Sequence, residues 1–116
     1  MDKKYQFTIK RVEKVLEVKT QGVFTQEDGM QYIADYKANV AKIKPDEFTL
    51  EFDCSNLSLN RPEVIPILQG CLEMYKKDGF KKVVSHIGNS PDRAIVRMQF
   101  MRLAKNAGLN NVEVVE

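Results

Sequence analysis

Strict alternation of apolar and polar residues in the segment FTLEFDC constrains the fold of this chain more than any other feature. Apolar side chains occupy every second position from Phe48 to Cys54, and Thr49, Glu51 and Asp53 stand between them. A period of two is that of a β-strand with one buried face. A strand that helices cover on both faces has a continuous apolar run instead. The segment therefore predicts a sheet whose helices pack mainly on one face.

Two alternating segments near the N-terminus predict a β-hairpin. In the first, Tyr5, Phe7 and Ile9 alternate with polar residues, and in the second Leu16 and Val18 do so. Only a short charged segment separates the two. We therefore expect these strands to pair in the antiparallel direction.

The first helix is predicted over about residues 26–43. Thr25 and Asp28 form a variant capping box at its start, in which the threonine hydroxyl accepts a hydrogen bond from an early helix amide. Pro45 stops it, because the residue before a proline disfavours helical geometry. Gly29 lies in the first turn, where a glycine costs about 1 kcal/mol relative to alanine.

Each of the two later helices follows a polar loop. The second has Pro62 and Pro66 near its start. Because a proline is tolerated only in the first turn, this helix either begins near Pro66 or is kinked at its start. For the third helix, Ser90 and Pro91 predict the N-cap and first position, and Gly108 predicts a glycine C-cap.

Strands at residues 80–87 and 112–115 complete the predicted order ββαβαβαβ. This order predicts an α/β fold with a small mixed sheet, an N-terminal hairpin and helices mainly on one face. A length of 116 residues is ordinary for one domain, and no linker or internal repeat divides the chain. We therefore expect a single domain over residues 1–116.

The N-terminal segment lacks the apolar core of a secretory signal, and no apolar run is long enough to span a membrane. Cys54 and Cys71 lie among apolar neighbours, where free cysteines behave as small buried hydrophobes. Their spacing predicts neither a disulfide nor a metal site. The net charge of +2 comes from interleaved acidic and basic residues, unlike the basic stripe of a nucleic-acid-binding protein. We expect a cytoplasmic protein with no cofactor.

The element order resembles that of the STAS domain, the fold shared by anti-sigma-factor antagonists and the cytoplasmic tails of sulphate transporters. Residues 48–88 resemble the central strand–loop–helix–strand unit of that family. In STAS domains this loop carries the signature D-S-[SA]-G, whose serine a partner kinase phosphorylates to switch binding. Ser58, Leu59, Asn60 and Arg61 stand at the four positions here, and none matches. The resemblance therefore implies a STAS-like module without that phosphorylation switch.

Two loops are the candidate binding site, because ligands and partners of an open α/β sheet meet the carboxyl ends of its parallel strands. These are the loops at residues 55–61 and 86–93, and both lead into helix N-termini, which suit an anion or a carboxylate. Their candidate partner- or ligand-binding residues are Ser55, Ser58, Asn60, Arg61, His86, Asn89, Ser90 and Arg93. In the alternative interpretation, Asn60 and Ser90 only cap helices and the two arginines are solvated.

No catalytic constellation can be read from the sequence. His86 is the only histidine, and Ser85 precedes it in a strand, so the two side chains point to opposite faces and cannot pair. Glu51 and Asp53 share a polar strand face, which solvent exposure explains more simply than acid–base chemistry. No glycine-rich phosphate-binding loop occurs. The sequence therefore favours a protein that is not an enzyme.

Methionine supplies a second candidate surface. Met98 and Met101, with Phe100 and Met74, form either an adaptable apolar surface or part of the core, and we expect the core. The sheet face without helices is available for docking or for a homodimer.

We therefore expect a cytoplasmic, non-catalytic STAS-like module that docks a protein partner through the two loops and the start of the second helix. The alternative is a carrier or sensor that holds a small apolar or anionic ligand between the helices and the sheet. Distant STAS-like single-domain proteins, some proposed to bind small apolar ligands, resemble the chain about as well. A cavity reached from the Met98 and Met101 side favours the carrier.

Overall fold

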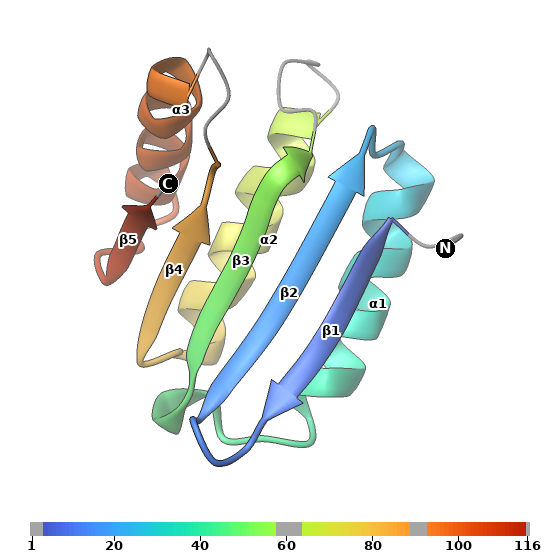
Figure 1. Cartoon of the computed structure of the whole chain (residues 1–116), viewed down its shortest axis with the longest axis vertical. Helices are drawn as coiled ribbons and strands as arrows, with labels where there is room; N and C mark the ends of the chain where they lie inside the picture. The colour runs from blue at the N-terminus through green and yellow to red at the C-terminus, as the bar shows by residue number, and fades with distance from the viewer. Residues whose placement is uncertain (1–3, 58–63, 89–92, 116) are drawn as a thin grey trace.

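The computed structural model of the chain describes residues 4–57, 64–88 and 93–115. Within these ranges five strands form one sheet in the order β1-β2-β3-β4-β5 (Figure 1). The elements are β1 (Tyr5–Lys10), β2 (Val15–Gly22), α1 (Gln26–Val40), the 3-10 turn η1 (Pro45–Glu47), β3 (Thr49–Leu57), α2 (Val64–Asp78), β4 (Lys82–His86), α3 (Arg93–Asn106) and β5 (Val112–Val115). β1 is antiparallel to β2, and the other neighbouring strands are parallel. The predicted fold class and element order are confirmed.

All three helices lie on the same face of the sheet, as Figure 1 shows. The covered face carries the fully buried side chains Leu16, Val18, Leu50 and Val83. The residues between them point to the opposite face, which we call the open face. The division of the FTLEFDC segment into a buried and a polar side is therefore confirmed, and it gives the sheet one dry and one wet surface.

Both ends of the first helix follow from local chemistry. The Asp28 amide donates to Thr25 Oγ1 at 3.1 Å and the Thr25 amide donates to Asp28 Oδ2 at 2.9 Å, so the predicted capping box is present. α1 ends at Val40, three residues before the predicted end, and a turn and η1 carry the chain past Pro45 into β3. A Cβ atom on Gly29 would lie 2.8 Å from Ile67 Cγ2. The glycine is therefore explained by the close approach of α1 to α2.

The later helices also depart little from prediction. α2 begins at Val64 with Pro66 as its third residue, where the missing amide has no intrahelical partner to lose. Pro62, Ser90 and Pro91 lie outside the described residues. α3 ends in a Schellman motif: the Leu109 amide donates to Ala104 O at 2.9 Å, and Gly108 has a φ of 75°. The predicted glycine C-cap is confirmed.

Aromatic side chains tie α1 and α2 to the sheet. Tyr32 and Tyr75 are buried, and their hydroxyl oxygens lie 2.6 Å apart. Tyr36 donates to Asp78 Oδ2 at 2.6 Å, and Tyr5 donates to Asp35. Each tyrosine hydroxyl therefore has a partner, as buried polar groups require.

The Tyr32–Tyr75 hydrogen bond predicts a non-additive pair of substitutions. Tyr75→Phe leaves the buried Tyr32 hydroxyl without this partner, so we expect the free energy of unfolding to fall by about 1–3 kcal/mol. Adding Tyr32→Phe removes the orphaned hydroxyl, and the double variant is expected to recover most of the loss. Urea unfolding of the wild type, the two single variants and the double variant measures this coupling as a double-mutant cycle. Strictly additive losses would contradict it.

The tyrosines also predict alkaline unfolding. Burial, with a hydrogen bond to Asp35, raises the pKa of Tyr5 to about 12. Burial also raises the pKa of Tyr32, Tyr36 and Tyr75. In the unfolded chain a tyrosine titrates near pH 10, so the folded state binds the protons more tightly. Stability is therefore fully present below about pH 10 and is lost as the pH rises above it. We expect tyrosinate absorbance to rise together with the loss of helical circular dichroism; tyrosinate formed near pH 10 in the folded protein would contradict the prediction.

Candidate functional site

The carboxyl ends of β2, β3 and β4 lie along one edge of the sheet (Figure 1). The two predicted binding loops leave the sheet from this edge. Of their eight candidate residues, the structure describes Ser55, His86 and Arg93. The other five, namely Ser58, Asn60, Arg61, Asn89 and Ser90, lie outside the described residues.

The starts of the two loops touch each other. Gly88 has a φ of 74°, and a Cβ atom on it would lie 2.8 Å from the Cβ of Ser55. Only glycine fits this position, both because of the positive φ and because of the contact. The special role of Gly88 could not be predicted from the sequence, since a glycine after a strand is an ordinary turn signal.

Gly88 gives a testable prediction about how the two loops are held together. Gly88→Ala is expected to lower the free energy of unfolding by the backbone strain, about 1–2 kcal/mol, plus the cost of the clash with Ser55. Gly79→Ala is the matched control, because Gly79 has a φ of 77° and nothing within 4 Å of its added Cβ. Denaturant unfolding compares the two. Equal losses would show that the contact with Ser55 is not tight.

His86 and Ser85 lie on opposite faces of β4, as predicted. Ser85 is fully buried on the covered face, and its Oγ forms no hydrogen bond with any described residue. His86 is on the open face, where its Nε2 lies 3.1 Å from Oε1 of Glu51 on β3. Both side chains of this pair are partly exposed. The geometry gives His86 a carboxylate neighbour and keeps it away from the Ser85 hydroxyl.

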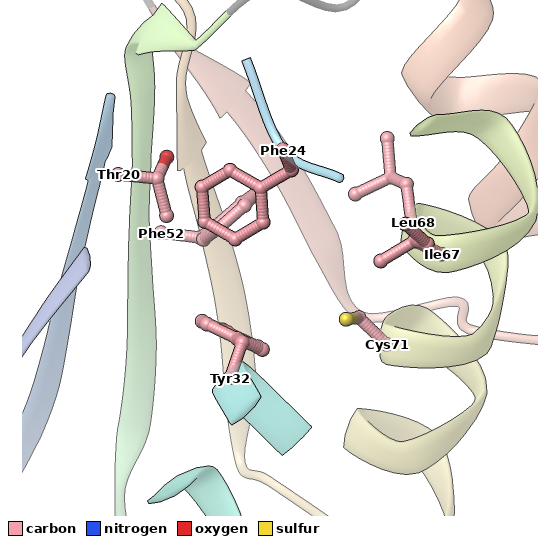
Figure 2. Close-up of a pocket in the computed structure, with 7 residues that line it drawn as sticks. All are labelled: Thr20, Phe24, Tyr32, Phe52, Ile67, Leu68 and Cys71. Carbon is pink, nitrogen blue, oxygen red and sulfur yellow. The ribbon is translucent and has the colours of Figure 1, made fainter. Parts of the chain in front are cut away.

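A small apolar hollow lies between the sheet and the first turns of α2 (Figure 2). Its volume is about 20 Å³, enough for about one water molecule. It is lined by Thr20, Phe24, Tyr32, Phe52, Ile67, Leu68 and Cys71. The Thr20 hydroxyl donates to Asp53 O at 2.9 Å, so it offers the hollow no free donor. Burial raises the pKa of the Cys71 thiol to about 12, which keeps it neutral and a poor nucleophile.

The hollow is not the cavity that the sequence analysis associated with the methionines. None of its lining residues belongs to α3. Met98 and Met101 are 68% and 42% exposed on the outer side of α3, so the expectation that they fill the core is wrong. Phe100 is buried and Met74 packs against the core, as expected. The 3.6-residue period alone does not decide which face of α3 points to the core. The exposure of these two methionines therefore could not be predicted from the sequence.

A second hollow, which we call the polar pocket, lies on the open face and has a volume of about 150 Å³. It is lined by Lys4, Gln6, Lys19, Thr20, Gln21, Asp53 and Asn56. Gln6, Lys19 and Asp53 belong to one row, because β1, β2 and β3 pair them directly. Alternation in the sequence assigns Gln6, Lys19 and Asp53 to strands but does not give the register between those strands, so the pocket could not be predicted from it.

An irregularity in the sheet completes the polar pocket. The β2–β3 register changes from Lys19 opposite Asp53 to Gln21 opposite Asn56, which leaves an extra residue on β3. Residues three apart lie on opposite faces of a regular strand, whereas a bulge re-aims one of them. Asp53 and Asn56 therefore line the same pocket.

Charges of both signs lie in the polar pocket. Asp53 Oδ1 accepts hydrogen bonds from the Ser55 amide at 3.0 Å and the Ser55 hydroxyl at 2.6 Å. Lys4 Nζ is held by Val23 O and Asp28 Oδ2, each at 2.7 Å. This ion pair lowers the pKa of Asp28. Lys19 is 62% exposed, and its Nζ comes no closer than 3.9 Å to Glu17 Oε1.

Metal ligation and membrane insertion are two further possibilities for the described ranges. No three of their histidine, cysteine, aspartate and glutamate side chains gather closely enough to hold a metal ion. None of their helices has both the length and the apolar composition that crossing a membrane requires.

Comparison with known proteins adds no assignment. No protein-family model matches the chain. No curated protein matches it either.

Proposed function

We propose that this chain is a non-catalytic, STAS-like binding or regulatory module that docks a protein partner at the edge where β2, β3 and β4 end. The contact surface comprises the loops at residues 55–61 and 86–93 and the first turns of α2. The observation that carries the proposal is the apolar hollow beneath those turns. Its lining includes Ile67 and Leu68, which belong to the first turns of α2 and so to the proposed contact surface.

The size of the hollow favours a protein partner over a free ligand. Pockets for drug-sized molecules measure about 300–1,000 Å³, whereas this hollow measures about 20 Å³. It accommodates the tip of one aliphatic side chain once Ile67, which is only partly buried, moves aside. A buried apolar anchor surrounded by polar groups is the usual anatomy of a protein interface. Ser55, Asn56 and Arg93 supply polar groups at this edge.

The alternative function is a carrier or sensor of a small apolar ligand in the same hollow. It is supported by the lining, which consists of apolar groups except for the Cys71 thiol and the hydroxyls of Thr20 and Tyr32, both of which are hydrogen-bonded elsewhere. A ligand would have to displace Ile67 and Leu68 and widen the space between α1 and α2. Native mass spectrometry separates the two functions, because a carrier holds a stoichiometric small mass that is lost on denaturation.

The docking proposal predicts which substitutions abolish partner binding. Ile67→Glu places a charge at the hollow and Arg61→Glu reverses a charge on the first loop, so each is expected to reduce partner recovery at least about tenfold. Ile95→Glu is the matched control, because Ile95 is an exposed apolar residue on α3. Quantitative affinity purification from the host extract measures recovery, and circular dichroism checks that each variant is folded.

A recovered protein is accepted as the partner only if both the wild type and the Ile95→Glu control recover it. Hydrogen exchange of that complex should show protection of α2's first turns and of the residues around Ser55. Recovery that both loop and hollow substitutions leave unchanged would refute docking at this edge.

A further inference from the structure

We propose that the polar pocket binds a small zwitterion, a molecule with one ammonium and one carboxylate group such as a free α-amino acid. The pocket lies on the open face, and none of its lining residues belongs to a helix; of the residues that line the apolar hollow it shares only Thr20. The inference does not rest on the docking proposal, and either can fail alone.

The volume of the pocket sets the size of the ligand. A cavity of about 150 Å³ accommodates benzene, a molecule with about six non-hydrogen atoms. The polar pocket has this volume, and the smallest α-amino acids have about as many non-hydrogen atoms. Unlike a cavity for benzene, this one is lined by charged and amide side chains. The ligand is therefore small and strongly polar.

The negative end of the pocket is pre-oriented. The two hydrogen bonds from Ser55 hold Asp53 through Oδ1 alone. Within the described ranges, Oδ2 of Asp53 accepts no hydrogen bond, and no cation lies within ion-pair distance of this carboxylate. This oxygen is positioned to accept a charge-assisted hydrogen bond from a ligand ammonium.

The positive end is supplied by Lys19 on the neighbouring strand. Its Cα is paired with that of Asp53, so the two side chains start about 5 Å apart on the same face. Lys4 contributes little net charge, because Asp28 neutralises it. The amides of Gln6 and Asn56 add donors for a carboxylate. Lys19, whose contact with Glu17 is as long as 3.9 Å, and Asp53 thus stand side by side as one cation and one anion, as the two charges of an α-amino acid do.

This charge balance decides between ligand classes. A phosphate or other simple anion gains from Lys19 but is repelled by Asp53, and a metal cation finds only one carboxylate in the pocket. A neutral polyol offers no charge to Asp53 and leaves Lys19 with only the 3.9 Å contact to Glu17. A zwitterion satisfies both, and each contact is of the stronger, charge-assisted kind.

The test is a titration followed by amide NMR, with glycine and L-serine as probes. We expect saturable shifts confined to residues 4–6, 19–21 and 53–56. N-acetylglycine lacks the ammonium and glycinamide lacks the carboxylate, so each is expected to bind at least about tenfold more weakly.

Two variants assign the contacts. Asp53→Asn retains Oδ1 for the bonds from Ser55 and removes the charge, and Lys19→Met retains the aliphatic stem. Each is expected to weaken glycine binding about tenfold or more. The matched controls Glu113→Gln and Lys82→Met change an open-face ion pair outside the pocket, with Nζ and Oε2 at 2.6 Å, and should bind as wild type does.

Three outcomes would overturn the proposal. They are the absence of saturable shifts with both probes, equal affinity for glycinamide or N-acetylglycine, and binding of inorganic phosphate or glycerol that exceeds binding of glycine. Shifts that the Asp53 and Lys19 variants leave unchanged would place the ligand elsewhere and overturn it as well.

Discussion

One-sided burial of the sheet is the constraint on which the rest of the structure depends. Three helices pack on a single face, so each strand has to divide its residues between a dry side and a wet side (Figure 1). On the dry side, Leu50 and Phe52 meet the helices, and tyrosine hydroxyls that reach the interior find partners in one another or in aspartates. On the wet side, neighbouring strands align polar residues into rows, and one such row forms the polar pocket. The apolar hollow and the polar pocket are therefore products of the same division.

The sequence was sufficient for features that local chemistry decides. The capping box at Thr25 and Asp28, the glycine C-cap at Gly108 and the alternation from Phe48 to Cys54 each depend on residues close together in the chain. Their physical cause is therefore visible without knowledge of the tertiary contacts. The opposite orientations of Ser85 and His86 follow in the same way from the two-residue period of a strand.

Features that depend on contacts between distant residues could not be predicted in this way. A glycine at position 29 lowers the stability of the helix. The reason for it is the close approach of the Ile67 side chain, which is 38 positions away in the sequence. Met98 and Met101 are apolar, as core residues are, yet the orientation of α3 exposes them. The polar pocket needs the pairing of three strands and an irregularity in β3, neither of which leaves a distinct pattern in the sequence.

Thr20 shows how closely the two proposed sites are connected. It lines both the apolar hollow and the polar pocket, and its hydroxyl donates to the backbone carbonyl of Asp53. The sites therefore lie back to back across the β2–β3 pair. Their other lining residues are distinct, with Ile67 and Leu68 on one side and Lys19 and Asn56 on the other. A partner side chain and a small zwitterion would thus not compete for the same atoms. Thr20 is the lining residue that the two hollows share, and Asn56 belongs both to the polar pocket and to the proposed docking loop. Any influence of one ligand on the other would therefore pass through these residues.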